Sequence, residues 1–163
     1  SPLMKHNLLF ICTHNSARSI LSEGVCNNFF NDTMHGFSCG SNPSGIINPC
    51  ALEVLTDLEY DTSSMRSKSW DEFTNSDVKI DICFTVCDAA AGEVCPVFYG
   101  APLNVHWGLS DPSVIDDLAK RKLAFLKTAN VIKSNLEKLK NILDNHSKDD
   151  LLSLKGEIQS IHG

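Results

Sequence analysis

The feature that most constrains the fold is a short apolar run that is followed by a polar loop and then by a helical pattern. Leu8–Ile11 is apolar at every position, as in a strand that is buried on both faces of a sheet. The loop Cys12–Ser19 follows directly, and from Ser16 onward apolar residues recur at helical spacing. A buried strand that leads straight into a helix is typical of the first crossover of a parallel sheet.

The rest of the chain repeats this alternation. Further strands are expected at residues 37–40, 80–86 and 103–107, and helices from Asn48-Pro49, from the capping-box pattern Ser69–Glu72 and over residues 114–143. This order predicts an α/β fold, a three-layer sandwich with a mostly parallel sheet of four strands. Ligands bind such sheets at the carboxyl ends of the strands, which is where the Cys12–Ser19 loop lies.

Length and charge narrow the class of protein. The 163 residues suffice for one domain with a single core. A net charge of −6 provides no overall field that would attract nucleic acid or an anionic membrane surface. The N-terminal apolar run is too short for a membrane span and lacks the flanks of a secretory signal. We therefore expect a cytoplasmic protein whose natural chain starts at Met4.

Seven cysteines are many for a chain of this length, and their number is odd. The absence of a Cys-x2-Cys pair argues against a structural zinc site. A disulfide scaffold is not expected without a secretory signal. Several of the cysteines are therefore expected to be reduced and buried as small apolar side chains.

The loop Cys12–Ser19 has the pattern of an anion site. Cys12 and Arg18, separated by five residues, form an arc in which backbone N–H groups can point inward at the start of a helix. The Arg18 guanidinium can fork onto two oxygens of a tetrahedral anion, and the positive surroundings favour a Cys12 thiolate as nucleophile. Ser19 can donate to that thiolate, and Asn15 tolerates the left-handed conformation that such a loop needs. The residues expected to hold the oxyanion are Thr13, His14, Asn15, Ser16, Ala17, Arg18 and Ser19.

Four segments of the chain resemble the phosphatase-like arsenate reductases. They are Cys12–Glu23, Ser67–Asp71, Thr85–Pro96 and His106–Gly108. The Cys12–Ser19 loop, with Asp111-Pro112, is also similar to the low-molecular-weight protein tyrosine phosphatases, whose fold the resemblance implies. The resemblance predicts a phosphatase-like arsenate reductase domain over residues 4–144. Residues 145–163 would then be a C-terminal extension, either an extra helix or a loose tail.

The resemblance implies an internal relay of cysteines. Cys12 would attack arsenate, Cys87 would attack Cys12 and release arsenite, and Cys95 would carry the oxidation to the surface. An external thiol, thioredoxin or glutaredoxin with glutathione, would then reduce the protein, and no tightly bound cofactor is implied. If residues 87–95 were helical, their end Cα atoms would lie about 12 Å apart, whereas a disulfide needs about 7 Å or less. The segment must therefore bend or unwind during the cycle.

The four cysteines outside the relay are expected to have structural roles. Cys26, Cys39, Cys50 and Cys83 are most simply core residues. For Cys83, which lies four residues before Cys87, a role as a competing resolving thiol is the less favoured alternative.

Two further groups of residues have both a functional and a structural interpretation. By resemblance Asp111 is the general acid that protonates the leaving oxygen, while an Asp-Pro pair also suits a helix N-cap. Four oxygen donors resemble the potassium ligands of some reductases, with helix-surface and cap roles as the alternative: Asn15, Glu23, Ser38 and Asp71.

The resemblance favours an arsenate reductase that serves arsenical resistance. The tyrosine phosphatases carry an aromatic residue after the Asp-Pro pair, and this chain has Ser113. A tyrosine phosphatase that uses Cys12, Arg18 and Asp111 is the alternative. A third hypothesis is a non-catalytic oxyanion or thiol sensor, against which the presence of both a nucleophile and an acid argues.

Overall fold

The computed structural model describes residues 5–162, so the expected start at Met4 lies outside it. Four strands form one parallel sheet in the order β2-β1-β3-β4. Their bounds are β1 His6–Cys12, β2 Met34–Gly40, β3 Ile82–Thr85 and β4 Leu103–His106. The predicted α/β fold with a four-stranded parallel sheet is confirmed.

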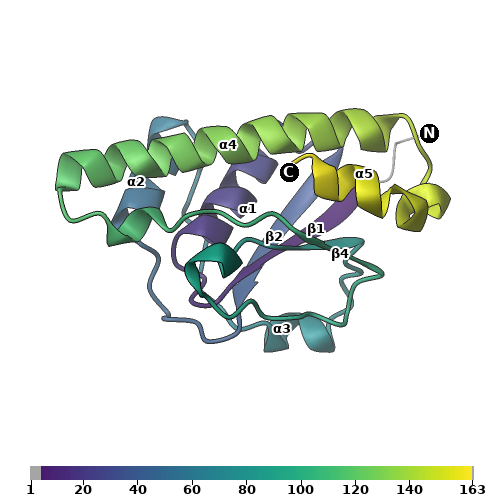
Figure 1. Cartoon of the computed structure of the whole chain (residues 1–163), viewed down its shortest axis with the longest axis horizontal. Helices are drawn as coiled ribbons and strands as arrows, with labels where there is room; N and C mark the ends of the chain where they lie inside the picture. The colour runs from purple at the N-terminus through teal and green to yellow at the C-terminus, as the bar shows by residue number, and fades with distance from the viewer. Residues whose placement is uncertain (1–4, 163) are drawn as a thin grey trace.

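Helices cover the two faces of the sheet unequally (Figure 1). The helices α1 Arg18–Phe29, α2 Pro49–Asp57 and α4 Leu118–Asp144 share one large core with the sheet, and α4 packs on both α1 and α2. The short helix α3 Asp71–Thr74 and its neighbouring loops cover a smaller apolar cluster around Leu9. These layers leave the carboxyl ends of the strands open for a site.

Local capping explains where two of the helices begin. The Asn48 side chain accepts a hydrogen bond from the Cys50 amide, and Pro49 occupies the first turn of α2, as predicted. The helix α4 begins at Leu118 rather than near Val114, because the Asp117 side chain caps it through the Lys120 amide. The strand β2 begins at Met34 rather than Phe37, because it pairs with β1 along its whole length.

The C-terminal segment forms a 3-10 helix, η3 Lys148–Leu154, and a final helix, α5 Lys155–Ser160. Ile158 is fully buried in the main core, so the segment is an added helix and not a loose tail. The Gln159 side chain pairs with both backbone groups of His106 on the edge strand β4. None of the helices among residues 5–162 is long and apolar enough to cross a membrane.

Candidate active site

The carbonyl groups of the loop after β1 are engaged on its outer side. The carbonyl oxygens of Thr13, His14 and Ser16 accept hydrogen bonds from amides of the segment 42–48 and are thereby turned outward. Asn15 is left-handed, with a φ of 48°, as predicted. Gly40 on β2 permits the close approach, because a Cβ there would lie 2.5 Å from the Thr13 carbonyl oxygen. With its carbonyls outward, the loop can direct N–H groups toward its centre at the start of α1.

The hydrogen bonds around Cys12 have a defined direction. The Lys68 amide donates to Asn15 Oδ1 at 2.9 Å, so the Asn15 Nδ2 group must be the donor to Ser19 Oγ at 2.8 Å. The Ser19 hydroxyl, whose oxygen is thus an acceptor, can direct its hydrogen to Cys12 Sγ at 2.8 Å. The predicted contact between Ser19 and Cys12 is therefore present in the structure.

Three of the four suggested potassium ligands lie together behind the loop. Asn15 Nδ2 donates to Ser38 Oγ at 3.0 Å, and the Ser38 hydroxyl donates to Glu23 Oε1 at 2.8 Å. The Lys68 ammonium lies 3.5 Å from Glu23 Oε1 and is largely buried, so a side chain already supplies positive charge here. Asp71 sits exposed at the start of α3, and no hydrogen bond or ion pair within residues 5–162 joins it to the other three.

Arg18 is buried at the first position of α1 and is held by a residue that sequence analysis missed. Its Nη1 and Nη2 atoms donate to the two carboxylate oxygens of Glu93 at 2.7 and 2.8 Å, and Nη1 also donates to the Leu109 carbonyl. Burial opposes the charged guanidinium, but the Glu93 hydrogen bond and the nearby Asp111 carboxylate outweigh it and raise the pKa of Arg18. The same hydrogen bond lowers the pKa of Glu93.

Asp111 takes part in a cap and also faces the anion site. Its Oδ1 atom accepts from the Ser113 amide at 2.9 Å and from the Ser113 hydroxyl at 2.7 Å. Its Oδ2 atom lies 3.8 Å from Arg18 Nη2. The cap is that of a 3-10 turn, η2 Pro112–Val114, and not of the long helix itself. The cap and acid interpretations of Asp111 are therefore compatible.

Cys12, Arg18 and Asp111 line one small pocket of about 180 Å³. A wider cavity of about 860 Å³ adjoins it through Arg18, His14 and Asp111, and its apolar wall includes Trp70 and Val114. A thiol, a guanidinium and a carboxyl group thus share one pocket at the carboxyl edge of the sheet. This arrangement suits attack on a tetrahedral oxyanion with proton transfer to the departing oxygen.

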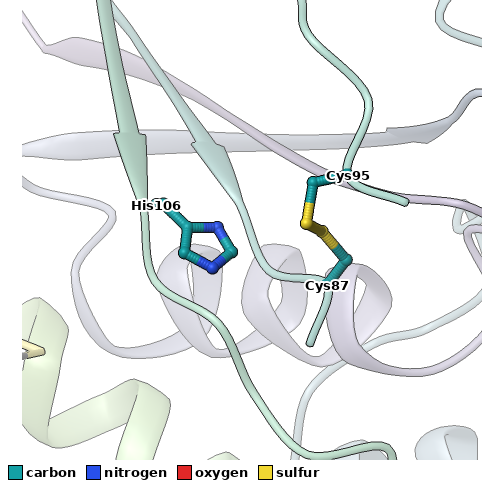
Figure 2. Close-up of side chains that lie close together, drawn as sticks. All are labelled: Cys87, Cys95 and His106. Atoms are coloured by element: carbon teal, nitrogen blue, oxygen red, sulfur yellow. A yellow bond between two sulfur atoms is a disulfide. The ribbon is translucent and has the colours of Figure 1, made fainter. Parts of the chain in front are cut away.

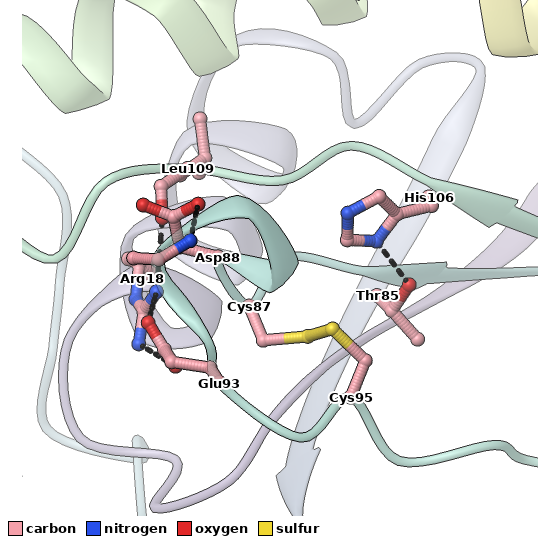
Figure 3. Close-up of a disulfide and its surroundings, with 9 residues drawn as sticks. Arg18, Thr85, Cys87, Asp88, Glu93, Cys95, His106 and Leu109 are labelled. Atoms are coloured by element: carbon pink, nitrogen blue, oxygen red, sulfur yellow. Dashed lines mark hydrogen bonds and ion pairs between the residues drawn. A yellow bond between two sulfur atoms is a disulfide. The ribbon is translucent and has the colours of Figure 1, made fainter.

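Cys87 and Cys95 form a disulfide beside this pocket (Figure 3). Their Cα atoms are 5.7 Å apart, so the segment between them is not a helix. It contains one 3-10 turn, η1 Ala89–Ala91, which Gly92 ends with a φ of 89°. Glu93 follows in the same segment and reaches Arg18. The predicted bending of the segment is therefore present in this disulfide form.

His106 is a second residue that sequence analysis left without a role. It stands at the end of β4 beside the disulfide (Figure 2), with its Nδ1 atom 2.8 Å from Thr85 Oγ1. One donor atom from each of Cys87, Cys95 and His106 lies within 4.8 Å of the other two. The segment His106–Gly108 belonged to the family resemblance, which was the only signal in the sequence.

The remaining four cysteines are free and buried, as predicted. Cys83 packs with Cys39 in the smaller apolar cluster on the far face of the sheet. Burial raises the pKa of Cys83 to about 12, which disfavours its thiolate. Cys83 is therefore poorly suited to compete as a resolving thiol.

Comparisons with known proteins agree with this geometry. Residues 7–149 match the family model for low molecular weight phosphotyrosine protein phosphatase. An arsenate reductase of Halalkalibacterium halodurans is 31% identical over 123 residues, which are 76% of this chain and 86% of that protein.

Solved structures show the same fold. An arsenate reductase in a phosphate-binding state superimposes with a TM-score of 0.63 and 23% identity, covering 88% of this chain and 100% of that one. A thioredoxin-dependent arsenate reductase of Corynebacterium glutamicum has a TM-score of 0.60 and 22% identity, covering 87% of this chain and 64% of that one. The chain belongs to the family of arsenate reductases built on the low-molecular-weight phosphotyrosine phosphatase fold.

Proposed function

We propose that this protein reduces arsenate to arsenite in the cytoplasm and that an external thiol regenerates it. The observation that carries the proposal is the Cys87–Cys95 disulfide beside a pocket that holds Cys12, Arg18 and Asp111. A phosphatase needs only the pocket, whereas a redox-active cysteine pair at its edge serves a reaction that transfers electrons.

The first step uses the pocket. Arsenate binds to the loop amides and to the forked Arg18 guanidinium, and the Cys12 thiolate attacks arsenic. Asp111 protonates the oxygen that leaves as water. The product is a covalent Cys12–arsenate adduct.

The second step transfers two electrons to arsenic. A Cys87 thiolate attacks Cys12 Sγ, and the electron pair of the sulfur–arsenic bond goes to arsenic, which departs as arsenite. A Cys95 thiolate then attacks Cys87 Sγ and releases the Cys12 thiolate, which leaves the disulfide present in this structure. Cys12 is the last residue of β1 and Cys87 follows the end of the adjacent strand β3, which supports their meeting. An external dithiol of the thioredoxin class reduces the disulfide, with glutaredoxin and glutathione as the alternative.

Glu93 makes arsenate binding depend on prior reduction of the disulfide. In the disulfide form its carboxylate accepts hydrogen bonds from both terminal nitrogens of Arg18, which are the groups needed to bind two oxygens of an oxyanion. The same segment carries Cys87, Glu93 and Cys95, so reduction of the disulfide frees the segment that holds Glu93 in place. Oxidised protein should therefore bind arsenate poorly until the thiols are restored.

The test is arsenite release coupled to thioredoxin, with peptide mapping after one equivalent of arsenate. In Cys95→Ser, one arsenite should be released and a Cys12–Cys87 disulfide should accumulate. In Cys87→Ser, the adduct on Cys12 has no resolving thiol, so no internal disulfide should form. Cys50→Ser, at a buried free cysteine that takes no part in the relay, serves as the control and should turn over normally. Full coupled turnover in both relay variants would leave a phosphatase-like enzyme with two incidental cysteines.

A further inference from the structure

The disulfide and His106 together form a cluster of metal-binding donor atoms, and the proposed reaction gives no role to His106. One ring nitrogen of His106 and the two sulfur atoms of Cys87 and Cys95 all lie within 4.8 Å of one another (Figure 2). The absence of a Cys-x2-Cys pair argued against zinc, but the fold brings these donors together from two places, the segment after β3 and the end of β4. Two thiolates and an imidazole are among the donor sets that zinc prefers.

The backbone spacing suits a metal ion as well as a disulfide. Zn–S bonds of about 2.3 Å place two thiolates on one tetrahedral ion roughly 3.8 Å apart. The Cys87 and Cys95 Cα atoms are 5.7 Å apart, so side-chain rotation can separate the sulfur atoms by that amount after reduction. The His106 nitrogen is already near enough to complete three ligands with small movements.

The burial of Cys87 favours a neutral metal complex over free thiolates. Cys87 is fully buried, and a buried thiolate without a cation is unfavourable. Two thiolates and one Zn²⁺ carry no net charge together, so the complex removes this cost. The Thr85 hydroxyl oxygen lies 2.8 Å from His106 Nδ1, and Gln159 holds the His106 backbone. Histidines that bind a metal usually have a hydrogen bond of this kind on one ring nitrogen.

The cluster also has a route to solvent. A cavity of about 370 Å³ opens beside it and is lined by Cys95 and His106, with Lys155 and Gln159 of α5 on its wall. This space admits an ion and leaves room for a water molecule as fourth ligand.

We propose that, once the disulfide is reduced, Cys87, Cys95 and His106 bind one Zn²⁺ ion. A dithiol supplies two electrons and two protons, which convert the disulfide to two thiols. Zn²⁺ then replaces the two thiol protons, which pass to solvent, and takes a lone pair from the neutral imidazole. The metal complex and the disulfide use the same sulfur atoms and exclude each other, so bound zinc holds the cysteine pair reduced and unavailable for the relay.

The site is tested with Co²⁺, which reports its ligands by absorption. Reduced protein, held without oxygen or arsenate, is titrated with Co²⁺. We expect one equivalent to bind with a thiolate-to-cobalt band in the near ultraviolet and the intense visible bands of tetrahedral cobalt. Addition of Zn²⁺ should abolish both sets of bands, and protein with the disulfide intact should give neither.

Variants assign the ligands. Cys95→Ser and His106→Ala should lose the tetrahedral spectrum, and His106→Cys should restore it with a stronger thiolate band. Cys12→Ser, whose sulfur is not a ligand, and His146→Ala, at an exposed histidine, should retain it. Circular dichroism checks that each variant is folded.

The proposal fails if reduced protein gives no thiolate-to-cobalt band, or if folded Cys95→Ser and His106→Ala give the same spectrum as the parent. Because no arsenate is used, a failure here leaves the proposed reductase activity untouched. Conversely, metal binding would persist even if the protein proved unable to reduce arsenate.

Discussion

Asn15 is the residue through which the shape of the anion loop and the hydrogen bonding of Cys12 are set together. Its positive φ bends the arc, and its side chain is oriented by the Lys68 amide. It then donates to Ser19, which leaves the Ser19 hydrogen available for Cys12 Sγ. One residue thus joins the backbone geometry of the loop to the hydrogen bond that reaches Cys12.

The forked contact of Arg18 predicts that a lysine cannot replace it. Arg18→Lys keeps the charge but has a single ammonium, which cannot contact two oxygens of a planar or tetrahedral anion at once. Arsenate turnover should fall by about 100-fold or more. Cys12→Ser should abolish turnover, because a hydroxyl in this loop stays protonated near neutral pH. Steady-state kinetics measure both, and a fully active Arg18→Lys would refute the two-point contact.

The two oxygens of Asp111 separate its roles, which makes them testable. Asp111→Asn keeps an oxygen that can accept from the Ser113 amide but removes the acidic proton. Hydrolysis of an aryl phosphate should slow by about 100-fold, while phosphate binding changes little. Ser113→Ala, which removes only the hydroxyl contact to Asp111, is the control and should remain active. Equal losses in the two variants would assign Asp111 to the cap alone.

At the scale of elements, Glu93 lies in the segment between Cys87 and Cys95, so the redox state of the two cysteines affects the contact of Glu93 with Arg18 at the anion site. Glu93→Gln removes the negative charge from Arg18, so oxidised protein should bind phosphate about tenfold more tightly. Calorimetry on the disulfide form measures this, and reduced protein should show a smaller change. Glu72→Gln breaks a similar forked pair with Arg66 on the surface and serves as the control. Unchanged affinity in oxidised Glu93→Gln would remove Glu93 from any gating role.

The same segment shows what the sequence could and could not reveal. Cys12, Asn15 and Ser19 were predicted because consecutive residues build the loop by local rules. Glu93 and His106 were missed because only the tertiary fold carries them to Arg18 and to the disulfide. The start of α4 was misplaced near Val114, since Asp117 is the residue that caps it and the apolar pattern alone does not mark that boundary.

At the scale of the whole molecule, an acidic chain places two largely buried cationic side chains where an anion would bind. The net charge is −6, yet Arg18 is buried at the loop and Lys68 is largely buried behind it. The C-terminal segment covers the edge strand of the sheet, because α5 packs on β4 and Trp107 Nε1 donates to the Ile158 carbonyl. We propose that residues 145–163 are an extension of the family domain, of which Leu151, Leu154 and Ile158 are part of its core.

If the C-terminal segment is part of the core, one substitution in it should lower the free energy of unfolding strongly. Ile158 is fully buried, so Ile158→Ala should lower the free energy of unfolding by about 2–5 kcal/mol. Leu152→Ala, at a side chain that is 64% exposed in the same segment, should change it by about 0.5 kcal/mol or less. Urea denaturation of the two variants and the parent under identical redox conditions measures both changes. Because Gln159 neighbours Ile158 and holds the His106 backbone, Ile158→Ala should also weaken Co²⁺ binding by the reduced protein. Equal stability of the two variants would show instead that α5 lies on the domain without stabilising it.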